Sequence, residues 1–289
     1  GNIYKFLSPN DYLIARFTGR YVTDYMNAHK WHYDIKNRRY PLELLKEIGI
    51  SENLLPEVIS PGTSVGNVSK QAYGETGLSE KTKVIVTTYD AICSFIGSGV
   101  AEEGEASDVS GTVTVFRAVS KDMVQITNKI QQIPYYEGDI NIVGGSNNLG
   151  GGLIEWVKQC YYQSENLPYE LMEKDAGEAS LGAGGVIFLP YLLGERAPIW
   201  DCNARGVFFG LERMHTRKEM TRAVFESTGF IDLDMIAAIE ETGLHVNSIR
   251  LSGGLARLNL ISQIKADITG RELHVLSEFE TTATGAAMM

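Results

Sequence analysis

Small, apolar and polar residues follow one another most regularly in a stretch of the second half of the chain. Gly206 and Gly210 enclose a short apolar run, which indicates a strand bounded by turns. Thr216 precedes Glu219 at the spacing of a capping box, in which a hydroxyl and a carboxylate bond reciprocal backbone amides. Apolar residues then recur at helical spacing over positions 220–227. This stretch predicts a strand, a loop and an amphipathic helix that packs on a sheet.

The N-terminal region, to about residue 82, has the pattern of short helices joined by loops. A helix is expected to begin after Ser8 or Asn10, either of which is a good N-cap, and to end at Gly19. Residues 41–49 repeat the pattern, with proline at the start and glycine at the end. Prolines then punctuate a loop over residues 56–62.

From residue 84 onward the pattern alternates between short apolar strands and helices, which is typical of an α/β protein. Residues 97–104 are small and polar enough to be a crossover between domains. The expected strands are 84–86, 106–109, 112–115, 125–136, 140–143, 249–252 and 273–276, and the expected helices include 91–98, 153–161 and one ending at 269.

Composition narrows the class of protein. The chain has 289 residues, 44% of them hydrophobic and 21% charged, which is ordinary for a globular protein with room for two domains. A formal charge of −10 argues against nonspecific nucleic-acid binding. The three cysteines form no CxxC pair and no metal cage. The longest apolar run, 186–193, is too short to span a bilayer, and no secretory leader is visible. We expect a cytoplasmic protein with no membrane or nucleic-acid partner.

Asp90 is the leading candidate for catalysis. It stands where a strand ends and a helix begins, so its carboxylate faces the positive end of the helix. That field favours the ionised form, which suits a base that takes a proton from a hydroxyl. An aspartate in this position is also a common helix cap, and local sequence alone favours that role.

Two glycine-containing turns are candidates for ligand binding. In Ser110-Gly111-Thr112, a glycine between hydroxyl residues lets backbone amides approach a phosphate, although most such turns only reverse the chain. Gly253 and Gly254 follow a strand and precede a helix, where a ligand can lie against the backbone. A tight packing turn explains that pair equally well.

The spacing from Gly206 to Glu226 resembles the second signature of the FGGY carbohydrate kinases. The signature's fixed positions are all met, including Gly210, Leu211, Glu219, Met220 and Ala223. The N-terminal region is similar to the family as well, with the runs Asp11-Tyr12-Leu13, Thr18-Gly19, Thr23-Asp24 and Leu54-Leu55-Pro56.

This resemblance implies an α/β protein with the two-domain, actin-like ATPase or ribonuclease H-like fold. The chain would hold the end of the first, sugar-binding domain over residues 1–100 and most of the second, nucleotide-binding domain over 101–289. The family uses ATP and Mg²⁺ to phosphorylate a small sugar. Asp90 would then be the catalytic base, with a possible contact to the metal of Mg-ATP. Tyr89 departs from the residues usual before that base.

The same resemblance assigns nucleotide-binding roles. Gly111 and Thr112 would hold phosphates, and Gly152 would contact the nucleotide from the glycine run near residue 150. The segment 249–257 is similar to the family's adenosine motif and adds Gly253, Gly254 and Arg257. Relatives place a polar residue directly after the basic one. Here Leu258 stands there and Asn259 follows, which shifts a base or ribose contact by one residue.

The substrate ranking rests on two segments, 197–200 and 252–257, whose forms resemble gluconokinases. We expect gluconate first and xylulose second. Glu195 and Arg196, just before the first segment, are expected to form an ion pair that holds their loop. Two other classes stay open. One is an inactive kinase-fold sugar sensor or scaffold. The other is a sugar kinase with a repressor domain, although no basic segment or helix-turn-helix pattern favours it.

Both ends of the chain predict a fragment. It enters structured sequence at Gly1 and stops at Met289 inside a helix of small residues. We expect it to lack the family's N-terminal phosphate loop and extreme C-terminus, and therefore to be inactive alone. A homodimer is an expected assembly of the whole protein.

Overall fold

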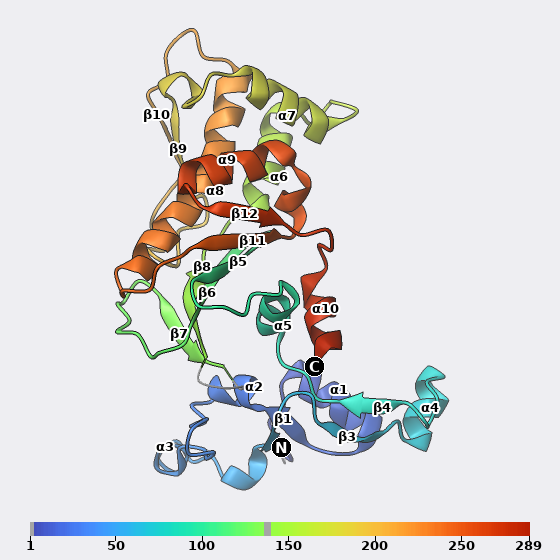
Figure 1. The fold of residues 1–289 in the computed structure, drawn as a ribbon. Helices are drawn as coiled ribbons and strands as arrows, with labels where there is room; N and C mark the ends of the chain where they lie inside the picture. The colour runs from blue at the N-terminus through green and yellow to red at the C-terminus, as the bar shows by residue number, and fades with distance from the viewer. Residues whose placement is uncertain (1–2, 136–139) are drawn as a thin grey trace. The chain divides into compact units, whose positions relative to one another are not determined.

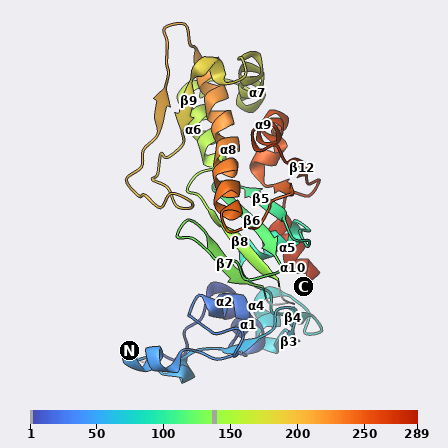
Figure 2. The same cartoon turned by 60° about the vertical axis from the view of Figure 1, so that its left-hand side comes forward.

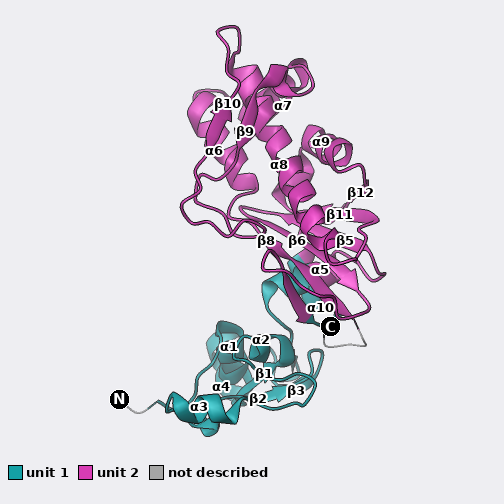
Figure 3. Ribbon diagram, turned by 90° about the vertical axis from the view of Figure 1, so that its left-hand side faces the viewer, with its two compact units in different colours: residues 1–94, 134–138, 282–289 teal, residues 95–133, 139–281 magenta. Residues whose placement is uncertain are grey.

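The computed structural model describes residues 3–135 and 140–289. The chain divides into two compact units, one drawn from residues 1–94, 134–138 and 282–289 and the other from 95–133 and 139–281 (Figure 3). In these described ranges no helix combines the length and apolarity needed to cross a membrane.

The first unit contains short helices, as the N-terminal pattern predicts, and also three short strands before residue 82 that the pattern did not predict. Ser8 caps the first helix with a capping box, and Gly19 ends it in the left-handed conformation at φ 78°. Its elements are α1 (Pro9–Thr18), β1 (Val22–Asp24), α2 (Tyr25–His29), α3 (Leu42–Glu47), η1 (Glu52–Leu54), β2 (Glu57–Ile59), β3 (Ser64–Asn67), α4 (Lys70–Thr76) and β4 (Lys83–Ile85), followed by the start of α5 (Asp90–Gly97) and by α10 (Thr281–Met288).

The second unit is built on a mixed six-stranded sheet in the order β12-β11-β5-β6-β8-β7 (Figure 1). β11 pairs in parallel with β5 and β12, whereas β5 and β6 form the antiparallel hairpin predicted at Ser110-Gly111. The strands are β5 (Glu105–Ser110), β6 (Thr114–Ser120), β7 (Gln131–Pro134), β8 (Asn141–Ser146), β11 (Ser248–Ser252) and β12 (Glu272–Val275), with β9 (Ile187–Leu189) and β10 (Val207–Phe209) as a separate antiparallel pair.

One strand prediction was too long. Within the expected strand 125–136, only Gln131–Pro134 is extended, and Ile126 is exposed rather than packed. Ile130, in the part of the stretch that is not a strand, nevertheless packs in the core of the second unit. Tyr136 lies outside the described residues.

The helices of this unit are α6 (Gly151–Tyr161), α7 (Pro168–Glu178), the short η2 (Ala183–Gly185) and η3 (Gly254–Arg257), α8 (Arg217–Glu240) and α9 (Asn259–Thr269). Of these, α8, α9 and η3 contact strands of the sheet. Thr216 and Glu219 form the predicted capping box at the start of α8. Figure 2 shows α8 as the long central helix of this unit, and it contacts α6, α7, α9 and β9.

The burial of α8 differs from the prediction. Every residue from Thr221 to Gly229 is buried, so the helix is enclosed on most sides along this stretch. The sequence pattern indicated burial of one apolar face only, because several of the residues that are in fact buried are polar and were expected to face solvent. Among them, Arg222 pairs with Glu226 and Thr228 donates to the carbonyl of Phe225, so their polar atoms are satisfied inside the unit.

Candidate nucleotide-binding and active site

A cavity of about 610 Å³ lies in the second unit. Four separate segments meet there: the β5–β6 turn, the first turns of α6, the start of α7, and η3. The predicted residues Gly111, Thr112, Gly152, Gly254 and Arg257 all lie among its walls. The full lining is Gly111, Thr112, Gly151, Gly152, Ile154, Glu155, Tyr169, Gly254, Leu255, Arg257 and Leu258.

Two of the glycines face open space. A side chain at Gly254 would meet no atom within 4 Å, and one at Gly111 would have its nearest neighbour at 3.9 Å. Their bare backbone is therefore available to a ligand in the cavity rather than to a neighbouring strand.

The glycines at the start of α6 are required for a different reason, which is close packing against the β5–β6 turn. The amide of Gly151 donates to the carbonyl of Gly111 at 2.7 Å, and the amide of Gly150 donates to that of Thr112 at 2.9 Å. A Cβ on Gly151 would lie 2.7 Å from the Gly111 oxygen, and one on Gly150 would lie 2.4 Å from Thr114 Oγ1. Only glycine lets this helix start press so closely on the β5–β6 turn.

Gly253 and Asn259 do not line the cavity. Gly253 has φ +85°, and a Cβ there would lie 2.6 Å from the carbonyl oxygen of Ser110. Its glycine is thus required for packing against β5, the alternative that local sequence left open. Asn259 is the exposed first residue of α9, and the cavity wall is formed by the preceding Leu258.

Glu155 and Tyr169 add polar atoms to the mainly apolar lining of the cavity, and neither was predicted from the sequence. Lys158 donates to the hydroxyl of Tyr169 at 2.9 Å, and Glu155 contacts both of these side chains. Hydrogen bonds from Lys158 and Tyr169 lower the pKa of Glu155. Local sequence carried no signal for Tyr169, because only the packing of α7 on α6 brings it to the cavity. Arg257 stacks its guanidinium 4.9 Å from the ring centre of Phe279.

Asp90 belongs to the first unit and is the first residue of α5. It is exposed, and its Oδ1 accepts a hydrogen bond from the amide of Ala91 at 2.7 Å. The ammonium of Lys30 lies 3.4 Å from the ring centre of the preceding residue, Tyr89, and forms a cation–π contact with it. The structure thus places a carboxylate at a helix start, with a cation beside its neighbour in the chain.

The loop that follows residue 193 is held differently from the prediction. Glu195 Oε1 accepts the amides of Asn148 and Arg196 at 2.8 and 2.7 Å, and the Arg196 guanidinium donates to the carbonyl of Asn147. The expected ion pair between the two side chains is therefore wrong for this described segment. Burial, only partly offset by these amides, raises the pKa of Glu195.

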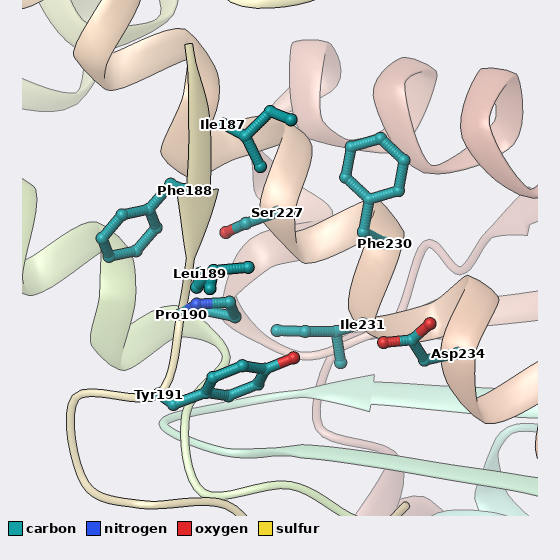
Figure 4. Close-up of a pocket in the computed structure, with 9 residues that line it drawn as sticks. All are labelled: Ile187, Phe188, Leu189, Pro190, Tyr191, Ser227, Phe230, Ile231 and Asp234. Carbon is teal, nitrogen blue, oxygen red and sulfur yellow. The ribbon is translucent and has the colours of Figure 1, made fainter. Parts of the chain in front are cut away.

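A second cavity, of about 240 Å³, lies between β9 and α8 (Figure 4). Ile187, Phe230 and Ile231 contribute apolar walls, and Asp234 is an acidic group at its edge. Burial raises the pKa of Asp234. None of the residues predicted to bind or react with a ligand lines this cavity.

Comparisons with known proteins connect these features to a family. The N-terminal domain of the FGGY family of carbohydrate kinases matches residues 1–97, and the family's C-terminal domain matches residues 106–289. The chain belongs to the FGGY family. The resemblance drawn from the signature between Gly206 and Glu226 is confirmed.

Individual FGGY kinases cover nearly the whole chain. A xylulose kinase from Staphylococcus xylosus is 28% identical over 99% of this chain and 59% of its own length. The crystal structures of gluconate kinase and of ligand-bound xylulose kinase from Lactobacillus acidophilus are both 29% identical, with TM-scores of 0.88 and 0.89, over 99% of this chain and 58% of theirs. The predicted actin-like α/β fold is confirmed. The chain spans about six tenths of the length of these relatives.

Proposed function

We propose that the whole protein containing this chain transfers a phosphoryl group from ATP to a hydroxyl of a sugar, sugar acid or polyol. The observation that carries the proposal is the cavity of the second unit. Backbone from Gly111, Thr112 and Gly254 is open to it, and apolar side chains form its walls. An open glycine backbone suits phosphates, and flat apolar walls suit a purine base.

Phosphoryl transfer depends on positioning and charge neutralisation more than on covalent chemistry. In our proposal Gly111 and Thr112 hold phosphates, while Gly152, Gly254 and Arg257 contact the nucleoside. Gly253 acts indirectly, by allowing η3 to lie against β5, and Asn259 is not needed for the contact. We place the boundary between the two domains near residue 100.

Asp90 is proposed as the general base that takes the proton of the attacking hydroxyl. Its exposed carboxylate, fixed at the start of α5, can reach a ligand without rearranging the core. Capping alone explains the position as well, so kinetics must separate the two roles.

Mg²⁺ fits this chain only as a companion of ATP. The described residues contain no group of three His, Cys, Asp or Glu side chains that could hold a metal ion. Mg²⁺ is commonly held by one or two carboxylates together with substrate phosphates, so Asp90 could be its protein ligand. The ion would neutralise the phosphate charge.

For the sugar we rank gluconate before xylulose. Gluconate carries a carboxylate, and a carboxylate needs a cationic partner when it is bound. Lys30 places an ammonium beside Tyr89, the residue before the proposed base, which supports a sugar acid. Both sugars occur among the names of the similar kinases, so the names do not decide the ranking.

A coupled ADP-release assay on the whole protein, run over gluconate, xylulose, glycerol and related sugars, tests the function. Turnover with any one of them that is lost in Asp90→Asn supports the kinase. Sugar binding by calorimetry without ADP release from any of them would instead support the inactive sensor. A cytoplasmic location and a homodimer remain predictions.

A further inference from the structure

Three charged side chains meet inside the second unit without any exposure to solvent. The Lys265 ammonium on α9 lies 2.5 Å from Asp108 Oδ2 on β5 and 2.7 Å from Asp232 Oδ2 on α8, and all three side chains are 0% exposed. Removing ions from water is costly even when they are paired, so such a cluster is weak evidence for stability. Asp232 Oδ1 has no hydrogen-bond partner among the described residues, which adds to that cost.

The cluster is bonded to the base of the β5–β6 turn. Ser110 Oγ donates to Asp108 Oδ1 at 2.6 Å and accepts from Lys265 Nζ at 3.3 Å. The same hydroxyl lies 3.1 Å from Thr114 Oγ1. Ser110 and Thr114 are direct partners in the sheet, and residues 111–113 form the turn between them. The buried charges therefore reach both ends of the turn that faces the nucleotide cavity.

The opposite contacts of the turn are made by backbone. The amides of Gly150 and Gly151 donate to the carbonyls of Thr112 and Gly111, and Gly253 packs on the backbone of Ser110. These contacts restrict movement of the backbone around Gly111. The conformation of the turn is then sensitive to any displacement of Ser110.

The charge state of the cluster supports a stable anchor. Burial lowers the pKa of Lys265, but the two carboxylates outweigh burial and raise it, so the ammonium stays protonated at neutral pH. Burial and then the neighbouring Asp108 raise the pKa of Asp232.

We propose that Lys265 is a positioning residue for the nucleotide phosphates: through Asp108 and Ser110 it holds the backbone of Gly111 and Thr112 in the conformation that receives them. This inference rests on the proposed nucleotide site. It does not place Lys265 in contact with the nucleotide.

Three variants of the whole protein test the proposal. Lys265→Met removes the anchoring charge at nearly constant length. Ser110→Ala keeps the charges and removes only the hydroxyl that links them to the turn, so it carries the test if Lys265→Met does not fold. Arg222→Met is the matched control, because Arg222 and Glu226 form another buried ion pair of the same unit, at 2.7 Å and with 7% and 10% exposure. Within the part of the chain that the structure describes, the side-chain hydrogen bonds of this pair join the two residues to each other and Glu226 to the amide of Gly182, away from the turn.

Two readouts are needed. The first is amide hydrogen exchange of Gly150 and Gly151, which donate to the carbonyls of Thr112 and Gly111, without nucleotide. The second is the Kd for ATP by calorimetry, and both are measured well below the Tm of each variant. Lys265→Met should accelerate the exchange of these two amides and raise the Kd about tenfold, the effect expected when a buried hydrogen-bonded network is broken. Ser110→Ala should do both to a smaller degree, and Arg222→Met should leave both within about twofold despite a lower Tm.

Unchanged exchange at Gly150 and Gly151 in folded Lys265→Met or, failing that, in Ser110→Ala would overturn the proposal. Equal acceleration in Arg222→Met would do so as well, because it would show general loosening. If the unaltered protein does not bind ATP while Lys265→Met still loosens the turn selectively, the proposed function fails and the positioning role of Lys265 for the turn remains.

Discussion

The two units carry their candidate chemistry in different ways. In the first unit it is one exposed side chain, Asp90, whose place is set by the start of a single short helix. In the second unit it is a surface assembled from four segments, and the backbone of several glycines forms part of that surface. A side chain of the first kind can be removed without disturbing the fold. A surface of the second kind can be changed cleanly only where a glycine faces open space, as at Gly254, and not where it faces backbone, as at Gly253.

The largest expected effect separates the side chain from the surface. Asp90→Asn should lower kcat by about 10²- to 10⁴-fold, the usual worth of a general base, and leave the Kd for ATP unchanged. Steady-state kinetics and calorimetry on the whole protein measure the two quantities. The control is Ser69→Ala, which removes the cap of α4 in the same unit. A loss below tenfold in Asp90→Asn would reduce Asp90 to a helix cap.

The next effect distinguishes the two kinds of glycine. Gly254→Val adds bulk in open space on the cavity wall, so it should raise the Kd for ATP about tenfold or more with little change in Tm. Gly253→Ala forces a side chain against Ser110 at φ +85°, so it should lower the Tm. Calorimetry and thermal melts of both variants check this. Unaltered ATP affinity in Gly254→Val would mean that the nucleotide binds elsewhere.

A smaller effect concerns the sugar and the first unit. Lys30→Met should raise the KM for gluconate about fivefold, since an exposed charge contact contributes little, and leave the KM for xylulose within twofold. Kinetics with both sugars measure the ratio. Equal changes for the two sugars would show that Lys30 supports Tyr89 rather than a carboxylate, and the ranking of gluconate would lose its structural support.

The smallest effect is on the pH dependence of stability. Burial, and then Asp108, raises the pKa of Asp232 above its ordinary 3.8, so the native state keeps a proton that the unfolded chain releases. The free energy of unfolding should therefore fall as pH rises from 3.8 toward the native pKa. In Asp232→Asn, the part of the fall in unfolding free energy that comes from this proton should be absent. Denaturant melts over this range measure it, and parallel curves for the two proteins would contradict the assignment.

Local pattern was a good guide to elements with strong boundary signals. Ser8, Gly19 and the pair Thr216–Glu219 act at helix ends as predicted, because a cap bonds amides within a few residues of itself. Pattern failed where tertiary burial decides. Residues 125–130 form no strand although Ile130 packs in the core, and polar positions of α8 are buried because other residues satisfy them.

The amino-acid sequence by itself determined the family, through a signature whose positions lie within a single strand, loop and helix. It also indicated glycines that line the cavity of the second unit. The tertiary structure alone decided what each glycine faces, since Gly253 and Gly254 are equivalent in sequence terms but meet different neighbours. It alone joined Tyr169 to the cavity and Lys265 to Asp108. Such contacts depend on how helices pack over a sheet, and residue spacing along the chain does not encode them locally.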